Sequence, residues 1–440
     1  MNEVEISKHH RVRFRLIQAA LAIAILFEGT TRLGLAALFK KFWIDESTGL
    51  KTTLDTSFLE LLQFKAPGTE LTPSPLHFFG DRLLLWIFHF RPQFYGDLRL
   101  LLRLPHIVYW SLAAVAVFIF LEAFLAKKMA TMRDGTRLLL ATAAAFFYHS
   151  NTFAQYYAIE SRAYSLWCSL ATIHLLFFIW SVCFGLSRRQ WLGYATASLL
   201  LVLTTVASLG MTLGCLILQF AFTNERKHLR RNIALVVLCF CIAGWNYSKM
   251  AQVHLDSGTW GLYFQEVGEV IAKSLHSHSR VAFALAFPFF CVFMPFWNRR
   301  SREYRVIYAT VWGSLVYTLF LVLNCRRHHY LVASRQFIFL VPYLSAAYLI
   351  GIVQIARWAA ALAGRISALA RLDFVRVLIV WSFLSLSSRF IHDGRAIRHD
   401  LVLFNERHAL SITQSSNCPE DRPDSLDGTL EKINDLCRSF

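Results

Sequence analysis

The sequence is poor in charged residues, and this scarcity decides its broad class. Only 17% of its 440 residues are charged, whereas 56% are hydrophobic and 38 are phenylalanine. The mean hydropathy is +0.43. Soluble domains rarely reach such values, and the apolar residues come in long blocks. The composition therefore excludes an ordinary soluble domain and indicates a polytopic membrane protein.

Acidic residues are scarcer than basic ones, with 28 Asp and Glu against 45 Lys and Arg, which gives a formal net charge of +17. In a soluble protein, this excess would suggest a nucleic-acid partner. Here the positive charge lies in short loops between apolar runs, as membrane insertion requires. We therefore expect membrane lipids as partners and no nucleic acid.

The chain also lacks cysteines at metal-ligand spacing, short internal repeats and low-complexity segments. Two of its nine cysteines, Cys418 and Cys437, lie in a polar tail and could pair if that tail faces an oxidising compartment. No cleavable signal peptide is evident. The basic stretch HHRVRFR at 9–15 precedes the first apolar run, which we expect to be a retained signal-anchor span.

The apolar runs predict an all-α protein with about eleven transmembrane helices, because about 20 residues cross a hydrocarbon core of roughly 30 Å. The stretch 191–222 would be about 48 Å long as one helix, so we expect two short spans that turn near 208–210. The predicted spans are 14–37, 105–125, 138–155, 164–185, 191–206, 209–222, 232–248, 280–297, 306–324, 336–356 and 377–391.

Loop charge sets the expected orientation. With eleven spans, every second loop carries a net charge of +2 or +3, while the long loop 39–104 has eight basic and seven acidic residues. The positive-inside rule then places the N-terminus in the cytoplasm and the C-terminus outside. We expect one transmembrane domain over 1–391 and a short polar outer tail over 392–440. The first outer loop is half apolar, and its apolar segments 83–90 and 98–104 predict interfacial helices.

Four polar clusters fall on the predicted outer side, in the sequences WIDEST, SPLHFFGDR, QYYAIESRAY and CRRHHYLVASRQ. A carboxylate at the membrane edge can act as a general base, and an arginine there suits a phosphate because its planar fork forms paired hydrogen bonds. The candidate site residues are Asp45, Glu46, His77, Glu160, Arg162, Tyr164, Arg326, Arg327 and Arg335.

Simpler interpretations of these residues stay open. Asp45 beside Trp43 can be polar punctuation at the headgroup layer, and Glu160 and Arg162 can be ordinary loop charges. His77 follows a proline and is either a loop histidine or a ligand. The pair at 328–329 fits solvated basic residues better than a metal site, and we assign no metal ligands.

The order of these elements resembles the GT-C superfamily of integral-membrane glycosyltransferases, in the bacterial branch related to protein O-mannosyltransferases and the lipid A aminoarabinose transferase. Asp-Glu in WIDEST follows the first span, PSPLHFFGDRLL replaces a Pro-Pro element, and GDLRLLLRLP leads into the second span. YAIESRAYSL then matches a Tyr-x-x-Glu-x-Arg-x-Tyr-x-Leu turn, and ASRQFIFLVPYL supplies an Arg before a span that contains Pro.

The resemblance implies transfer of a sugar from a polyprenyl-phosphate donor to a lipid, glycan or protein acceptor. Asp45 would be the general base, and Glu46 and Glu160 would support it or orient the acceptor. Arg335 would bind the donor phosphate, with Arg326 or Arg327 beside it. Some relatives use a divalent metal and others do not. The resemblance also implies a bacterial plasma membrane, with the site facing the periplasm.

A transporter or flippase of a lipid-linked sugar is the alternative function. Its binding residues should lie near the bilayer midplane, whereas the predicted span interiors carry few charges. A non-catalytic scaffold would not need carboxylates and arginines clustered on one side.

Overall fold

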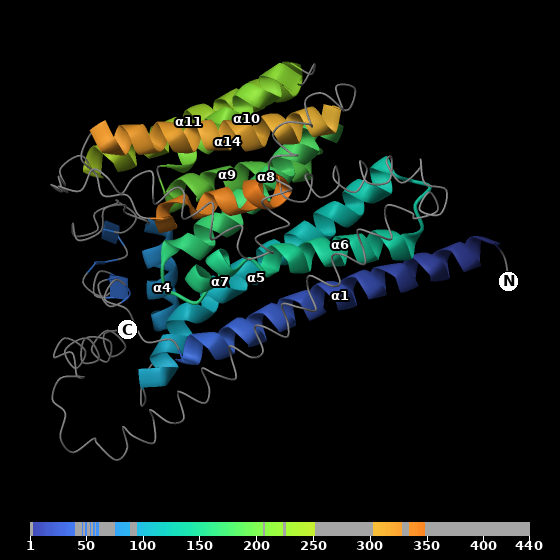
Figure 1. The fold of residues 1–440 in the computed structure, drawn as a ribbon, viewed down its shortest axis with the longest axis horizontal. Coiled ribbons are helices and arrows are strands. Elements are labelled where there is room, and N and C mark those ends of the chain that lie inside the picture. Colours follow the sequence, from blue (N-terminus) through green and yellow to red (C-terminus); the bar gives the residue numbers. More distant parts are fainter. Residues whose placement is uncertain are drawn as a thin grey trace, which may run out of the picture.

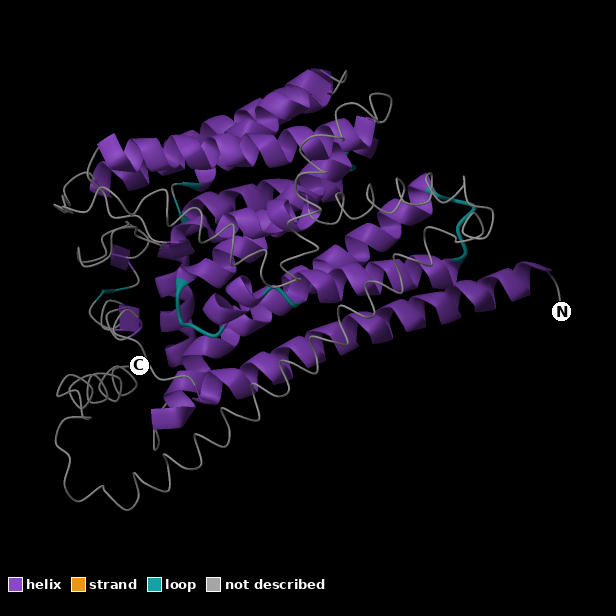
Figure 2. Ribbon diagram, in the orientation of Figure 1, coloured by secondary structure: helices purple, strands orange, loops and turns teal. Residues whose placement is uncertain are grey.

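The structure is a computed structural model, and its described part is helical (Figure 2). It describes residues 3–39, 46, 49–50, 53, 56–57, 59–60, 75–88, 95–205, 207–222, 226–250, 302–327 and 334–347. No strand occurs among these residues, as the apolar runs predict. The predicted spans 280–297 and 377–391 and the tail 392–440 lie outside the described residues.

Four described helices are long and apolar enough to cross a membrane, and we treat the chain as an integral membrane protein. The apolar stretches are Val12–Ala37 in α1 (Glu3–Phe39), Leu100–Lys128 in α5 (Tyr95–Lys128), Ala163–Phe184, which is α8, and Arg305–Leu323 in α14 (Arg302–Arg327). The span count of eleven and the orientation stay predictions.

Helix α8 forms the interior of the bundle. Of its apolar stretch, 72% is buried, compared with 22% for the stretch in α1, so α1 lies at the periphery. Gly185 ends α8 with φ of 76°, a backbone angle that favours glycine. Ser187 then starts α9 (Arg188–Thr204) with a capping box that it shares with Gln190.

The stretch 191–222 forms two helices, which confirms the predicted break, while the crossing of the membrane by each helix stays a prediction. Helix α9 ends at Thr204 and α10 (Ser208–Phe222) begins four residues later, slightly before the expected turn. The Tyr317 hydroxyl of α14 donates to the Ala207 carbonyl in the connection. This contact satisfies a backbone group that the turn frees from helical hydrogen bonding.

A chain of polar side chains links α8, α9 and α10 to α11 (Arg226–Met250). Gln219 Nε2 donates to Ser181 Oγ at 2.7 Å, and Asn232 Nδ2 donates to Gln219 Oε1. Trp191 Nε1 completes the chain by donating to Asn232 Oδ1 at 3.0 Å. Such hydrogen bonds between membrane helices fix their pairing in a medium that offers no water.

Two expected segments have different boundaries in the structure. Residues 98–104 do not form a separate interfacial helix; they are the first part of α5, which continues through Pro105. Arg103 is fully buried in this part, and its hydrogen bonds draw the segment into the bundle. The helix expected over 138–155 ends at His149, because Asn151 caps a new helix, α7 (Thr152–Ala158).

The polar segments gather at one end of the bundle. Figure 1 places α4 (Pro75–Phe88), α7, the C-terminal end of α1 and the N-terminal end of α5 at the same end of the long helices. Helix α4 also holds part of the long loop that precedes it. Arg82 Nη1 donates to the Thr53 carbonyl at 3.0 Å and to that of Thr56. This end therefore carries the acidic motif and the turn before α8.

Candidate functional site

A buried ion pair anchors the acidic motif to the second span. Arg103 Nε donates to Glu46 Oε1 at 2.9 Å, and Arg103 Nη2 donates to Glu46 Oε2 at 2.6 Å. Both side chains are 0% exposed. Arg103 Nη1 donates to the Ala37 carbonyl at 2.8 Å, near the end of α1, where carbonyls lack helical partners. One guanidinium thus joins the loop, α1 and α5 through paired, charge-assisted hydrogen bonds.

The turn between α7 and α8 completes this junction. Ser161 N donates to Glu46 Oε1 at 2.7 Å, and Ser161 Oγ donates to Asp81 Oδ2 of α4 at 3.2 Å. Two motifs that are 115 residues apart in sequence therefore meet at one buried carboxylate. Three hydrogen bonds from N–H groups therefore fix the position of this carboxylate.

The remaining residues of the turn take different positions. Glu160 is 0% exposed, whereas Arg162 is half-buried and lies with Cζ 5.8 Å from the centre of the Tyr164 ring. Tyr164 contacts Tyr157 edge-on at 5.5 Å between ring centres. The turn therefore combines a buried carboxylate with a half-buried arginine that lies against an aromatic ring.

A second polar group lies beside the junction, between α4 and α5. Asp81 Oδ2 is 3.6 Å from His77 Nδ1, and Asp81 Oδ1 is 3.6 Å from His106 Nε2. All three side chains are buried. His77 therefore belongs to a buried helix face, so its interpretation as a loop histidine is wrong. These residues form a set of two nitrogens and one oxygen that could hold a metal ion.

Burial controls the charge of the α4 residues. Burial lowers the pKa of His77 to about 4 despite the opposing effect of Asp81, and His106 and Arg162 lower it further. His77 is therefore neutral at neutral pH. Burial acts to raise the pKa of Asp81, but the two imidazoles and the Ser161 hydroxyl outweigh it, so this pKa lies below its usual value. Asp81 is consequently a carboxylate.

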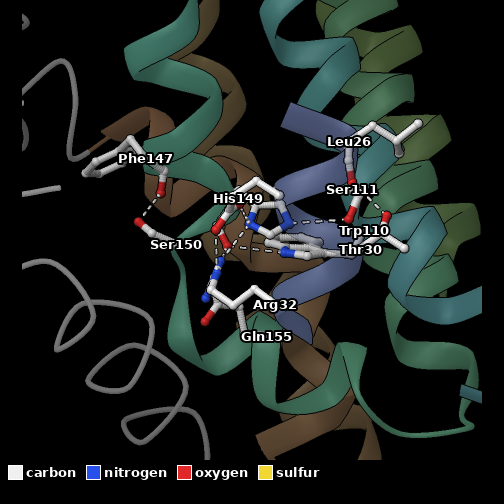
Figure 3. A network of polar contacts seen from close by, with 10 residues as sticks. Leu26, Thr30, Arg32, Trp110, Ser111, Phe147, His149, Ser150 and Gln155 are labelled. Carbon is white, nitrogen blue, oxygen red and sulfur yellow. Dashed lines mark hydrogen bonds and ion pairs between the residues drawn. The ribbon is translucent and has the colours of Figure 1, made fainter. Parts of the chain in front are cut away.

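A third polar network lies where α1, α5 and α6 (Asp134–His149) meet (Figure 3). Arg32 Nη2 is 3.0 Å from His149 Nδ1, and Arg32 Nε donates to Glu28 Oε1 at 2.7 Å. Because a guanidinium only donates, Nδ1 of His149 must carry a lone pair. The contact between His149 Nδ1 and Glu28 Oε2, at 3.9 Å, is therefore not an ion pair. Ser111 Oγ lies 3.4 Å from Nε2.

The remaining predicted site residues lie either outside the described residues or on α14 and η1. Asp45 lies outside the described residues, as does the pair at 328–329. Arg326 and Arg327 end α14, and Arg335 is the second residue of the 3₁₀ helix η1 (Ser334–Leu340). Phe339 of η1 packs against Trp167 of α8 at 5.2 Å between ring centres. This contact packs η1 against the N-terminal part of α8.

Sequence reasoning missed the partners that organise this region. Arg103 is part of the RLP element before the second span, but its ion pair with Glu46 is seen only in the structure. His106 directly follows that element, and Ser161 lies between two predicted site residues. A buried arginine and a histidine in the first turns of an apolar helix are costly unless they have partners, and this is the signal that points to them.

Comparisons with known proteins give a distant likeness. No family model matches the chain, and no curated protein matches it. Crystal structures of ArnT from Cupriavidus metallidurans are similar to it, one bound to undecaprenyl phosphate and one in the apo state. Identity to the bound form is 14%, over 96% of this chain and 77% of that one, with a TM-score of 0.47. Identity to the apo form is 13%, over 97% of this chain and 78% of that one, with a TM-score of 0.47. Likeness of this degree assigns no activity.

Proposed function

We propose that the protein is an inverting membrane glycosyltransferase that moves a sugar from a polyprenyl-phosphate donor to an acceptor on the outer face of the membrane. The observation that carries this proposal is the junction at Glu46, where the acidic motif of the first loop meets the Tyr-x-x-Glu-x-Arg-x-Tyr turn. The motifs that resemble the GT-C superfamily by sequence are thus brought together by hydrogen bonds.

The junction supports a division of roles between the two adjacent carboxylates. Arg103 binds both oxygens of Glu46, and the Ser161 N–H adds a third hydrogen bond. Glu46 is therefore the anchor that fixes the motif, and its neighbour Asp45 is the general base. Asp45 takes a proton from the acceptor hydroxyl, and the acceptor oxygen attacks the anomeric carbon as the bond to the phosphate oxygen breaks.

The leaving phosphate needs a cation, because negative charge develops on its bridging oxygen in the transition state. Arg335 fills this role, and the packing of Phe339 on Trp167 supports it by bringing η1 to the start of α8. Arg326 and Arg327 at the end of α14 are further candidates for the same phosphate. Glu160, Arg162 and Tyr164 form the acceptor side of the site.

The site is proposed to face the periplasm of a bacterial plasma membrane, and the acceptor is a lipid, glycan or protein. The expected distribution of loop charge supports this orientation. A transporter would instead place its binding residues near the bilayer midplane. The described ion pair between Glu46 and Arg103 lies at one end of the bundle, which favours the enzyme.

A transfer assay in membranes tests the proposal. Membranes with the wild-type chain receive a panel of polyprenyl-phosphate sugars, and product is followed by release of polyprenyl phosphate and by labelling of acceptor. Nucleotide sugars serve as the control donors, and we expect no direct transfer from them. A chain that moves the intact lipid-linked sugar across a vesicle membrane without cleaving it would contradict the enzyme and support a flippase.

A further inference from the structure

Three buried side chains form a group between α4 and α5, and two of them, Asp81 and His106, have no role in the proposed transfer reaction. His77 and Asp81 are one helical turn apart on the same face of α4, and His106 comes from the first turns of α5. Their exposed fractions are 3%, 5% and 1%. Candidate ligand atoms from the three residues all lie within 4.8 Å of one another.

Three of the four imidazole nitrogens of this group are buried without a hydrogen bond among the described residues. Nδ1 of His77 and both ring nitrogens of His106 are buried and have no hydrogen-bond partner among the residues that the structure describes. The distance of 3.6 Å from each imidazole to the Asp81 carboxylate exceeds that of a hydrogen bond. Buried polar atoms without partners are rare, so each requires an explanation.

The same distance suits two ligands of one cation. Zinc lies about 2.0–2.2 Å from nitrogen and oxygen ligands, so neighbouring ligand atoms in a tetrahedron are about 3.3–3.6 Å apart. Asp81 offers one oxygen toward each histidine, and the rings of His77 and His106 lie 5.0 Å apart at an angle of 64°. A single ion between them would take up one such nitrogen from each ring, Nδ1 of His77 and Nε2 of His106.

Surrounding side chains hold two of the three ligands, Asp81 and His106. Ser161 Oγ donates to Asp81 Oδ2 at 3.2 Å, and Ser165 Oγ donates to the backbone carbonyl of His106. His106 also contacts Tyr109 edge-on, at 5.9 Å between ring centres. Metal sites use such outer contacts to orient their ligands, and these contacts are already present here.

We propose that His77, Asp81 and His106 bind a divalent metal ion, with Zn²⁺ as the preferred ion. Two imidazoles and one carboxylate favour zinc over magnesium or calcium, which prefer oxygen ligands. Three protein ligands leave one tetrahedral position, which water can fill. The ion fastens α4 to α5 beside the Glu46–Arg103 pair. This site does not depend on the proposed transferase activity.

Metal content of the full-length protein tests the site. The chain is purified in detergent through a tag without histidines, stripped with EDTA, reloaded with Zn²⁺ and analysed by mass spectrometry for metal per chain. His106→Gln and Asp81→Asn remove one ligand each. His174→Gln is the matched control, because His174 of α8 is also buried, stacks on Tyr194 and belongs to no group of metal-ligand side chains among the described residues.

We expect one tightly held zinc per wild-type and His174→Gln chain, and an affinity more than about 100-fold lower in both ligand variants. Cobalt should give the visible absorption bands of a tetrahedral site in the wild type and lose them in His106→Gln. This spectrum of the wild-type chain decides the question if a variant fails to fold. Equal zinc content in wild type and ligand variants, or a cobalt spectrum of the hexahydrate alone, would overturn the proposal.

Discussion

Removing the Arg103 guanidinium should destabilise the protein strongly. Arg103→Met keeps the length of the side chain but removes both hydrogen bonds to Glu46 and the one to the Ala37 carbonyl. The Glu46 carboxylate then stays buried without the charge of Arg103. Breaking one partner of such a buried pair costs about 3–5 kcal/mol, and we expect this loss in the free energy of unfolding.

A double-mutant cycle separates this cost from the general effect of mutation. Glu46→Leu alone leaves the Arg103 charge buried and should cost a similar amount. The combination of Arg103→Met and Glu46→Leu removes both charges, so it should be more stable than the sum of the two changes predicts, by about 3 kcal/mol. Unfolding by SDS titration in mixed micelles measures all three variants.

Asp134→Asn is the control for loss of a carboxylate. Asp134 pairs with Arg137 at 2.7 Å, but its side chain is 41% exposed, so the change should cost less than about 1 kcal/mol. The reasoning would be refuted if Arg103→Met cost no more than this control. Additive single and double mutants would refute it equally, because the two side chains would then not act as a pair.

Three further changes test other parts of the structure. In Gly29→Ala, the new Cβ would lie 2.4 Å from His149 Nε2, so we expect the unfolding free energy to fall by about 1–3 kcal/mol. Gly34→Ala is the control, because its Cβ meets no atom within 4 Å and should be tolerated. Equal effects of the two changes on stability would contradict the packing around Gly29. Gln219→Leu should lower the unfolding free energy by about 0.6–2 kcal/mol, because it breaks the hydrogen bonds to Ser181 and Asn232. An unchanged unfolding curve would show that these hydrogen bonds do not stabilise the helix bundle. Arg335→Ala should raise the donor KM by about tenfold or more, with partial retention in Arg335→Lys, and an unaltered donor dependence would exclude Arg335 from the site.

The sequence allowed prediction of features that depend on length and composition. Long apolar runs gave the helical membrane class, and the excessive length of 191–222 gave the break between α9 and α10. The span count and the loop charge predict that the acidic pair and the turn at 159–162 lie on the same side of the membrane. The structure brings Glu46 and Ser161 of these two segments into direct contact.

The partners of the candidate residues could not be predicted, because they are set by packing between distant segments. Glu46 and its neighbour Asp45 look equivalent in sequence, and only the contact with Arg103 distinguishes the anchor. The segment 98–104 has an interfacial composition, yet burial of Arg103 makes it part of α5. His106 looks like a polar residue at the start of a span until α4 places Asp81 beside it.

Transfer by Asp45→Asn and Glu46→Gln, measured side by side in membranes with equal amounts of folded protein, tests the central claim most directly. The proposed mechanism predicts that Asp45→Asn abolishes sugar transfer from a polyprenyl-phosphate donor while the chain still inserts and folds. Glu46→Gln should keep measurable transfer, because its amide oxygen can still accept the hydrogen bond from Ser161. The variant should lose stability, because the buried Arg103 charge loses the Glu46 carboxylate. Transfer by Asp45→Asn at the wild-type rate would contradict the assignment of Asp45 as the base.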